Sequence, residues 1–371
     1  MLTHEHGVAG IDPHKNTATI AVLDHRGGVV DNKSFSITKG GIDELLTFLL
    51  GVELTIDRIG IEGSGFLGQP LVLALAAAGY DVREVQANRT AERRKRRRRA
   101  KTDAEDAEAI AREALSDPEL PPAGKHTAPS PTWQTLTVIR DWRESLVLQR
   151  VRLLTESEAV LVTLPVAIRA TLPSTSRVLP QLQSLVDGVA NPDLLSPAER
   201  LKLDRLAASL NDIITLTARI KELDRQIPAL LSDLGCTLTE VRGVGVVTAM
   251  DLLVEIGDPC RFTTEAQFAR WCGIAPVALS SGEGHGPARR HRLDLGGNRA
   301  VNSILHIVHV TQVRCHPPAK EYMAKRVTDN KTKREARRSH KRQLANIIIR
   351  HMWTDARRST ATTPTSSAAA A

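Results

Sequence analysis

The sequence is poor in aromatic residues, which make up 3% of its 371 residues. Because 42% of the residues are hydrophobic, a core is still possible, but Leu, Val, Ile and Ala must fill it. Cysteine is also scarce, and the four cysteines, Cys236, Cys260, Cys272 and Cys315, are widely spaced with no paired motif. This spacing argues against a structural zinc site and favours free thiols in a reducing compartment.

Long hydrophobic runs are absent as well. The longest, around residues 71–78, is far too short to span a bilayer, and no apolar segment of a signal peptide follows the opening MLTHEHG. The sequence therefore predicts a cytoplasmic protein with no membrane contact.

Basic residues are abundant and clustered. The formal net charge is +8 and the isoelectric point is about 9.5. Residues 89–101 contain nine basic residues and one acidic residue, and residues 320–358 contain thirteen basic and four acidic residues. Two basic segments on a mildly acidic remainder favour a nucleic-acid partner over a solvated basic surface, because such dense charge repels itself without counter-charges.

Hydrophobic periodicity predicts an α/β domain over residues 1–116. Three apolar or alternating segments read as strands, followed by a helix, a strand, a helix, a strand and a final helix over residues 103–115. This is the element order of a ribonuclease H-like domain.

The rest of the chain is predicted to be helical. A Pro-rich linker covers residues 117–131, and residues 132–234 carry two helices with apolar residues every seven positions, as in an antiparallel coiled coil for dimerisation. An intramolecular bundle without self-association is equally compatible with this periodicity. We predict a compact helical domain over residues 235–358 and a disordered tail over residues 359–371.

Four carboxylates stand at the ends of elements in the first domain. Asp12 ends the first strand and Glu62 the fourth, and Asp103 and Asp106 share one face of the following helix. If they converge, two Mg²⁺ ions would neutralise them and clamp a scissile phosphodiester. Helix capping by Thr102 and Glu105 explains part of this acidity, but it does not explain Asp12, Glu62 or Asp106.

These segments resemble a known family. The sequences GIDPHKNTATIAVLD, GIEGSG and KTDAEDAEAIA look like the RuvC-like DEDD domain of the IS110 (IS one-ten) family of insertion-sequence transposases. The resemblance implies that Asp12, Glu62, Asp103 and Asp106 are the catalytic metal ligands.

The second half carries further motifs. Gly243 and Gly245 lie in a turn that resembles a helix–hairpin–helix, whose backbone N–H groups can approach a phosphate, although a plain helix–helix turn is also compatible. The segment after residue 267 resembles the family's C-terminal transposase domain. The resemblance implies that Ser281 is the nucleophile that takes a DNA end as a phosphoserine, with Ser280 as a rival.

Several residues are candidates for contact with nucleic acid. Arg289, Arg290 and Arg292 would stabilise a phosphorane or hold a DNA backbone, and Asn298 belongs to the Gly-Asn signature. The family commonly has Leu-Arg after this signature, but this chain has Val301-Asn302, so that Arg is not carried over. The first basic segment adds Arg93, Arg94, Lys95, Arg96, Arg97, Arg98, Arg99 and Lys101.

The resemblance implies a bacterial, nucleoid-associated recombinase of an insertion sequence. Its partners would be donor and target DNA, a bridge RNA as guide, and further copies of the chain in a tetramer built as a dimer of dimers. A RuvC-like junction-resolving nuclease that uses metal-activated water needs no serine and is the first alternative. A non-catalytic nucleic-acid-binding protein and a coiled-coil adaptor are further alternatives, and neither explains the four acids.

Overall fold

The computed structural model describes residues 5–65, 67–86, 102–125, 129–188, 195–278, 291–293 and 297–362. The chain forms two compact units. Unit 1 combines residues 1–130 with residues 235–371, and unit 2 is residues 131–234. Within the described ranges, no helix is both long enough and apolar enough to cross a membrane.

The N-terminal part of unit 1 is built on a mixed five-stranded sheet with the order β3-β2-β1-β4-β5. β2 is antiparallel to β1 and β3, whereas β4 is parallel to β1 and β5. The predicted α/β element order is confirmed, and the strand order is the one that a ribonuclease H-like sheet requires. Its elements are β1 (Glu5–Pro13), β2 (Thr17–Asp24), β3 (Val29–Ser36), α1 (Lys39–Gly51), β4 (Leu54–Glu62), α2 (Gln69–Ala77), β5 (Val82–Val85) and α4 (Asp103–Ser116).

Alternation along the strands divides the sheet into two faces. Ala9 and Ile11 of β1 pack with Leu45 of α1 and Leu71 of α2 in one core. The alternate β1 residue Val8 packs instead with α4. Because successive side chains of a strand point to opposite faces, the even-numbered residues of β1 face α4.

Gly10 allows α4 to approach β1 closely. A Cβ atom at Gly10 would lie 2.1 Å from the backbone N of Ala111 and 2.3 Å from the carbonyl O of Ala107. Any side chain here would push α4 away from the sheet, and with it the acidic residues of the first turn of α4.

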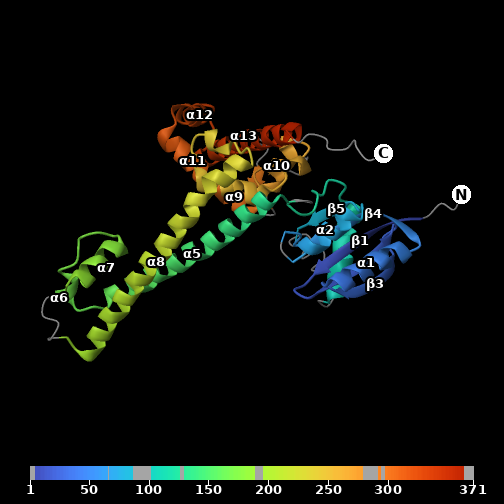
Figure 1. The fold of residues 1–371 in the computed structure, drawn as a ribbon. Helices are drawn as coiled ribbons and strands as arrows, with labels where there is room; N and C mark the ends of the chain where they lie inside the picture. The colour runs from blue at the N-terminus through green and yellow to red at the C-terminus, as the bar shows by residue number, and fades with distance from the viewer. Residues whose placement is uncertain are drawn as a thin grey trace. The chain divides into compact units, whose positions relative to one another are not determined.

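Unit 2 is dominated by two long helices that lie side by side, α5 (Pro131–Val162) and α8 (Pro197–Asp233) (Figure 1). Arg143 of α5 pairs with Asp224 of α8 at 2.5 Å, and Glu156 with Arg205 at 3.7 Å, so the helices run antiparallel. The short helices α6 (Val166–Arg169) and α7 (Val178–Asp187), which the periodicity did not predict, lie in the connection.

The heptad pattern has a structural counterpart on both long helices. On α8 the four predicted positions are buried, and on α5 two are buried and two are partly buried. The coiled-coil geometry and the self-association remain predictions. The positions are Leu206, Ile213, Ile220 and Ile227 on α8, and Ile139, Leu146, Leu153 and Val160 on α5.

The C-terminal part of unit 1 is helical apart from a small two-stranded sheet. Helices α11, α12 and α13 pack against one another, and α10 packs against α13. All four cysteines are free, as predicted. The elements are η2 (Leu238–Glu240), α9 (Val246–Ile256), η3 (Pro259–Arg261), α10 (Glu265–Trp271), β6 (Pro276–Ala278), β7 (His291–Leu293), α11 (Arg299–Cys315), α12 (Pro317–Thr328) and α13 (Lys333–Thr362).

Two histidines meet in the core between α11 and α13. The Nδ1 atoms of His309 and His340 lie 3.0 Å apart, and both side chains are buried. Burial, together with the neighbouring His340, lowers the pKa of His309 to about 4. The pair is therefore a neutral hydrogen-bonded contact between helices at physiological pH.

We expect Gly10→Ala to lower the free energy of unfolding by about 1–3 kcal/mol, because the added methyl group overlaps the α4 backbone. Urea denaturation measures the difference. Gly40→Ala in α1 is the matched control, since a Cβ there meets no atom within 4 Å. Equal stability of Gly10→Ala and wild type would contradict the close packing.

Acid should weaken the α11–α13 contact through His309. Its folded-state pKa of about 4 lies below the unfolded value of 6.5, so stability is complete above pH 6.5 and falls as pH drops toward 4. The slope is at most about 1.4 kcal/mol per pH unit for one proton. Denaturation of wild type and His309→Gln between pH 4 and 7 should show a smaller loss in the variant, whereas the exposed-site control His25→Gln should follow wild type.

Candidate functional site

Two parallel strands end side by side at the candidate site. β1 and β4 pair in parallel, with Ile11 opposite Ile61. Asp12 and Glu62 are the next residue on each strand, so they lie next to each other at the carboxyl ends of neighbouring strands. Both residues alternate with side chains that face the α1–α2 core, and both therefore lie on the face covered by α4. The predicted positions of Asp12 and Glu62 at the ends of their strands are therefore confirmed.

The first turn of α4 supplies the other two acids. The helix begins at Asp103, and the Thr102 side chain caps it by accepting a hydrogen bond from the Glu105 backbone N–H. Asp103 and Asp106 lie one turn apart on this helix end. Its unpaired N–H groups and dipole favour negative charge, which lowers the cost of placing two carboxylates there.

Electrostatics shows that the four carboxylates act on one another. The pKa of Asp12 is raised to about 6, mainly by burial and also by the charges of Asp106, Glu62 and Asp103, while His14 acts in the opposite direction. A carboxyl group with this pKa holds a proton more readily than usual unless a cation occupies the site. The structure thus brings together all four predicted acids.

His14 is a site residue that the sequence prediction missed. Its Nε2 lies 3.4 Å from Oδ2 of Asp12 and 3.3 Å from Oδ1 of Asp103. The ligand atoms of these three residues all lie within 4.8 Å of one another. The signal available in the sequence was the spacing of two from Asp12, which places both side chains on one side of an extended segment.

The donor set fits a divalent cation. Carboxylate oxygens are hard ligands of the kind that Mg²⁺ and Mn²⁺ prefer, and mutual repulsion among the acids is relieved by a positive ion. The imidazole of His14 adds a nitrogen ligand or a hydrogen-bond donor at the edge of the cluster.

Glu84 is a further, partly buried acid of this domain, and it lies on the other face of the sheet. It pairs in register with Ile61, and so lies on the opposite face of the sheet from Glu62. Burial raises its pKa to about 7, and Arg261 of the C-terminal part opposes the shift. Glu84 belongs to the contact between the sheet and η3.

Several predicted residues lie outside the described ranges. These are the nucleophile candidates Ser280 and Ser281, together with Arg289 and Arg290 and the basic residues 93–99 and 101. Arg292 lies in β7, opposite Val277 of β6, and nothing further is described for its side chain. Their functional roles remain predictions.

Three predicted contact residues occupy defined backbone positions. Gly243 has φ of +86°, and Gly245 is the N-cap of α9, so the glycines form the turn that enters this helix. The helix–hairpin–helix assignment remains a prediction. Asn298 caps α11 by accepting from the Val301 N–H at 2.9 Å, and its Nδ2 donates to Glu255 at 2.7 Å.

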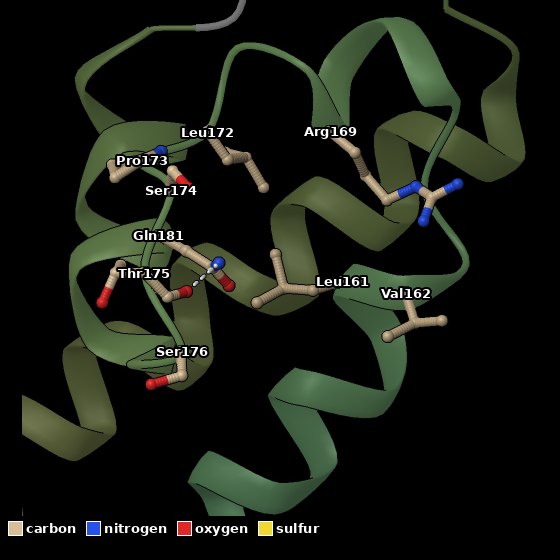
Figure 2. Close-up of a pocket in the computed structure, with 9 residues that line it drawn as sticks. All are labelled: Leu161, Val162, Arg169, Leu172, Pro173, Ser174, Thr175, Ser176 and Gln181. Carbon is tan, nitrogen blue, oxygen red and sulfur yellow. Dashed lines mark hydrogen bonds between the residues drawn. The ribbon is translucent and has the colours of Figure 1, made fainter.

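A pocket of about 520 Å³ opens in unit 2 near α6 and α7 (Figure 2). Among the lining residues that the structure describes, Arg169 is the single charged one, and its Nε donates to the Leu164 carbonyl. Gln181 is likewise engaged, with Nε2 donating to the Thr175 carbonyl at 2.9 Å. The lining contains no acid or base for catalysis, so the acidic cluster is the stronger candidate.

Two family profiles match most of the chain. A family profile described as a transposase matches residues 9–164, and a second, described as the transposase IS116/IS110/IS902 family, matches residues 236–324. The first range includes all four acids, and the second includes Ser281 and Asn298.

Three relatives support the same assignment. An IS110 insertion-element protein of Streptomyces coelicolor is 30% identical over 44% of this chain and 38% of its own length. A putative transposase of Sinorhizobium fredii is 27% identical over 56% and 50%, and a probable family 20 transposase of Pseudomonas aeruginosa is 30% identical over 58% and 60%. The matches thus span about two fifths to three fifths of these relatives.

Among solved structures, RuvC of T. thermophilus in complex with a Holliday junction substrate is similar over 29% of this chain and 90% of that chain. The identity is 14% and the TM-score is 0.23. The assignment of the fold rests on the strand order of the sheet.

We expect Asp12→Asn to be more stable than wild type at pH 8 in metal-free buffer. Because the folded pKa of about 6 lies above the usual aspartate value of 3.8, wild type loses stability as pH rises through this interval, by up to about 1.4 kcal/mol per pH unit. Added Mg²⁺ should raise the melting temperature of wild type and leave Asp12→Asn unchanged.

Thermal denaturation with and without Mg²⁺, between pH 4 and 8, measures both effects. Asp43→Asn on α1 is the matched control, since it removes an exposed acid of the same domain. An equal Mg²⁺ response in wild type and Asp12→Asn would contradict a cation site at the cluster.

Proposed function

Because the chain belongs to the IS110 family of transposases, we propose that it is the DNA recombinase of an insertion sequence, acting by metal-dependent strand cleavage and exchange. The observation that carries this proposal is the convergence of Asp12, Glu62 and the α4 acids at the ends of two parallel strands. The raised pKa of Asp12 shows that negative charge is unfavourable in this cluster, and a bound cation would offset that cost.

The four acids would hold two Mg²⁺ ions. Bound there, the ions would offset the negative charge that develops on a phosphodiester under attack. The chain's own contribution is placement. The strand ends fix Asp12 and Glu62, the close α4–β1 contact fixes Asp103 and Asp106, and His14 spans Asp12 and Asp103.

Ser281 is our proposed nucleophile. Its Oγ would form a bond to the scissile phosphorus, one bridging P–O bond would break, and the departing DNA oxygen would take up a proton. The seryl proton would pass to a base or to solvent. The resulting phosphoserine would then be attacked by the hydroxyl of another strand, which restores Ser281 and rejoins DNA.

The partners we propose are donor and target DNA, a bridge RNA that pairs with both, and a tetramer of this chain at the bacterial nucleoid. The basic residues 93–101, Arg289, Arg290 and Arg292 would contact phosphate backbones. The basic α12–α13 segment supports the same role, although some of its basic residues are engaged within the protein, such as Arg350 with Glu265. Lys341 is buried and donates to Asn302, so it is structural.

The nucleophile is tested by a covalent adduct. Wild-type protein incubated with Mg²⁺ and duplex DNA carrying an end of the element should form a protein–DNA adduct that survives denaturation. Ser281→Ala should form none, and Ser280→Ala should retain it. Asp103→Ala should lower the rate on the order of a hundredfold or more, since metal ligands matter at least as much as the residues that orient them.

The adduct assay also distinguishes between the alternative functions. Cleavage by Ser281→Ala without an adduct would identify a hydrolytic nuclease that uses metal-activated water. Normal strand exchange by Asp103→Ala would contradict the role of Asp103 as a metal ligand. An adduct on Ser280 alone would identify Ser280, and not Ser281, as the nucleophile.

A further inference from the structure

The two ends of the β6–β7 hairpin are clamped together at its root. A Cβ atom at Gly297 would lie 2.1 Å from both N and Cα of Gly273, so the two backbones touch there. The Asn298 N–H donates to the Trp271 carbonyl at 2.7 Å. The segment a few residues before β6 and the segment a few residues after β7 therefore form one junction, the hairpin root.

A buried lysine supports this junction from α13. Nδ2 of Asn302 donates to the carbonyls of Cys272 and Gly273 at 3.1 and 3.3 Å. Lys341 in turn donates to the Asn302 carbonyl at 2.8 Å and to its side-chain oxygen. The carbonyls of Trp271, Cys272 and Gly273, which lie just before β6, thus each have a donor.

Glu255 of α9 joins the junction to a different part of the chain. Its Oε1 accepts from Asn298 Nδ2 at 2.7 Å, and its Oε2 accepts from Lys125 Nζ at 3.0 Å. The Lys125 and Glu255 side chains are 27% and 14% exposed, so solvent screens this ion pair less than a surface pair.

Lys125 is anchored on both sides. Its carbonyl accepts from the Asp258 N–H at 2.6 Å, and the preceding carbonyl, of Gly124, accepts from Arg261 Nη1 at 3.0 Å. Arg261 is itself held against the rings of Phe262 and Trp271.

The same segment also reaches the acidic site. Gly124 N–H donates to the buried Oγ of Ser64 at 2.9 Å, and Ser64 stands two residues after Glu62 in the turn that follows β4. Residues 122 and 123 add backbone pairing to β5. A continuous polar path therefore runs from the Glu62 turn through Gly124, Lys125, Glu255 and Asn298 to the hairpin root.

From this geometry we infer that Glu255 is a positioning residue that couples the β6–β7 hairpin to the turn carrying Glu62. It acts through Lys125 and Asn298 and touches no reacting atom. The inference rests on the proposed function in one respect, because the hairpin is the element that leads to Ser280 and Ser281.

A carboxylate is suited to this task for a physical reason. One carboxylate accepts from two donors at once, and each bond to a charged group is stronger than a neutral one. Loss of the charge leaves Lys125 as a poorly solvated cation beside Arg261, and loss of the whole group leaves the Asn298 amide without this acceptor.

Hydrogen exchange tests the inference on the full-length chain without DNA. We expect Glu255→Gln to speed amide exchange of β6 and β7 about tenfold, equivalent to about 1.4 kcal/mol, and Glu255→Leu to speed it more. Exchange in β1 and β4 and the Mg²⁺-dependent rise in melting temperature should stay at wild-type values. A merely structural role would loosen the whole C-terminal part instead.

Together with Glu255→Gln, the variants Lys125→Met and Lys125→Met/Glu255→Gln form a double-mutant cycle, measured by the exchange rates of β6 and β7. If the ion pair carries the coupling, the double variant should exchange no faster than the faster single variant. Glu265→Gln is the matched control, because it removes an ion pair with Arg350 at the end of α10 opposite to Trp271 and the hairpin root. Additive effects, or unchanged exchange in both Glu255 variants, would overturn the inference.

Adduct formation supplies the second readout. The Glu255 variants should lower the rate of adduct formation about tenfold or more at saturating DNA and leave DNA affinity unchanged. Faster exchange with an unaltered rate would also overturn the positioning role. If wild type forms no adduct, the proposed function fails, and the exchange cycle alone decides whether Glu255 fixes the hairpin root.

Discussion

The close packing of α4 on β1 at Gly10 is the constraint on which the candidate site depends. It fixes the helix that begins at Asp103 against the strand that ends at Asp12, in spite of the repulsion between their carboxylates. Core packing of apolar residues around α4 supplies the opposing free energy, since Ile110, Ala111 and Ala114 are fully buried. A folded core thus sustains an arrangement of charge that is unfavourable by itself.

Local patterns in the sequence were sufficient for the sheet and for the four acids. Period-two alternation assigned Asp12 and Glu62 to strand ends, and helical spacing placed Asp103 and Asp106 on one face. The same patterns carry no information on contacts between distant segments. Lys125 and Glu255, or Glu84 and Arg261, are far apart in sequence, and nothing in their local spacing marks them as partners. His14 was missed because its spacing of two from Asp12 does not by itself distinguish a site residue from any other polar residue, and α6 and α7 were missed because they are short.

The short segment 119–125 explains how two different parts of unit 1 form one body. It pairs with β5 through backbone hydrogen bonds, and it meets α9, η3 and α10 through Lys125, the Arg261 contact and the ion pair between Glu119 and Arg270. The two regions matched by the family profiles, residues 9–164 and 236–324, therefore meet at residues that proline content alone marked as a linker. A Pro-rich stretch is compatible with an ordered strap when its carbonyls find donors on both sides.

The backbone contact between Gly273 and Gly297 has a consequence for how this family can vary. Since the hairpin begins and ends at one fixed point, the length of the segment beyond β6 and β7 does not alter the distance that the rest of the chain must span. Lengthening such a closed loop costs little, about 0.6 kcal/mol for each doubling in chain-entropy terms. We therefore expect a change in the number of residues between positions 278 and 291 to leave the start of α11 in place, because the Gly273–Gly297 contact fixes both ends of the hairpin.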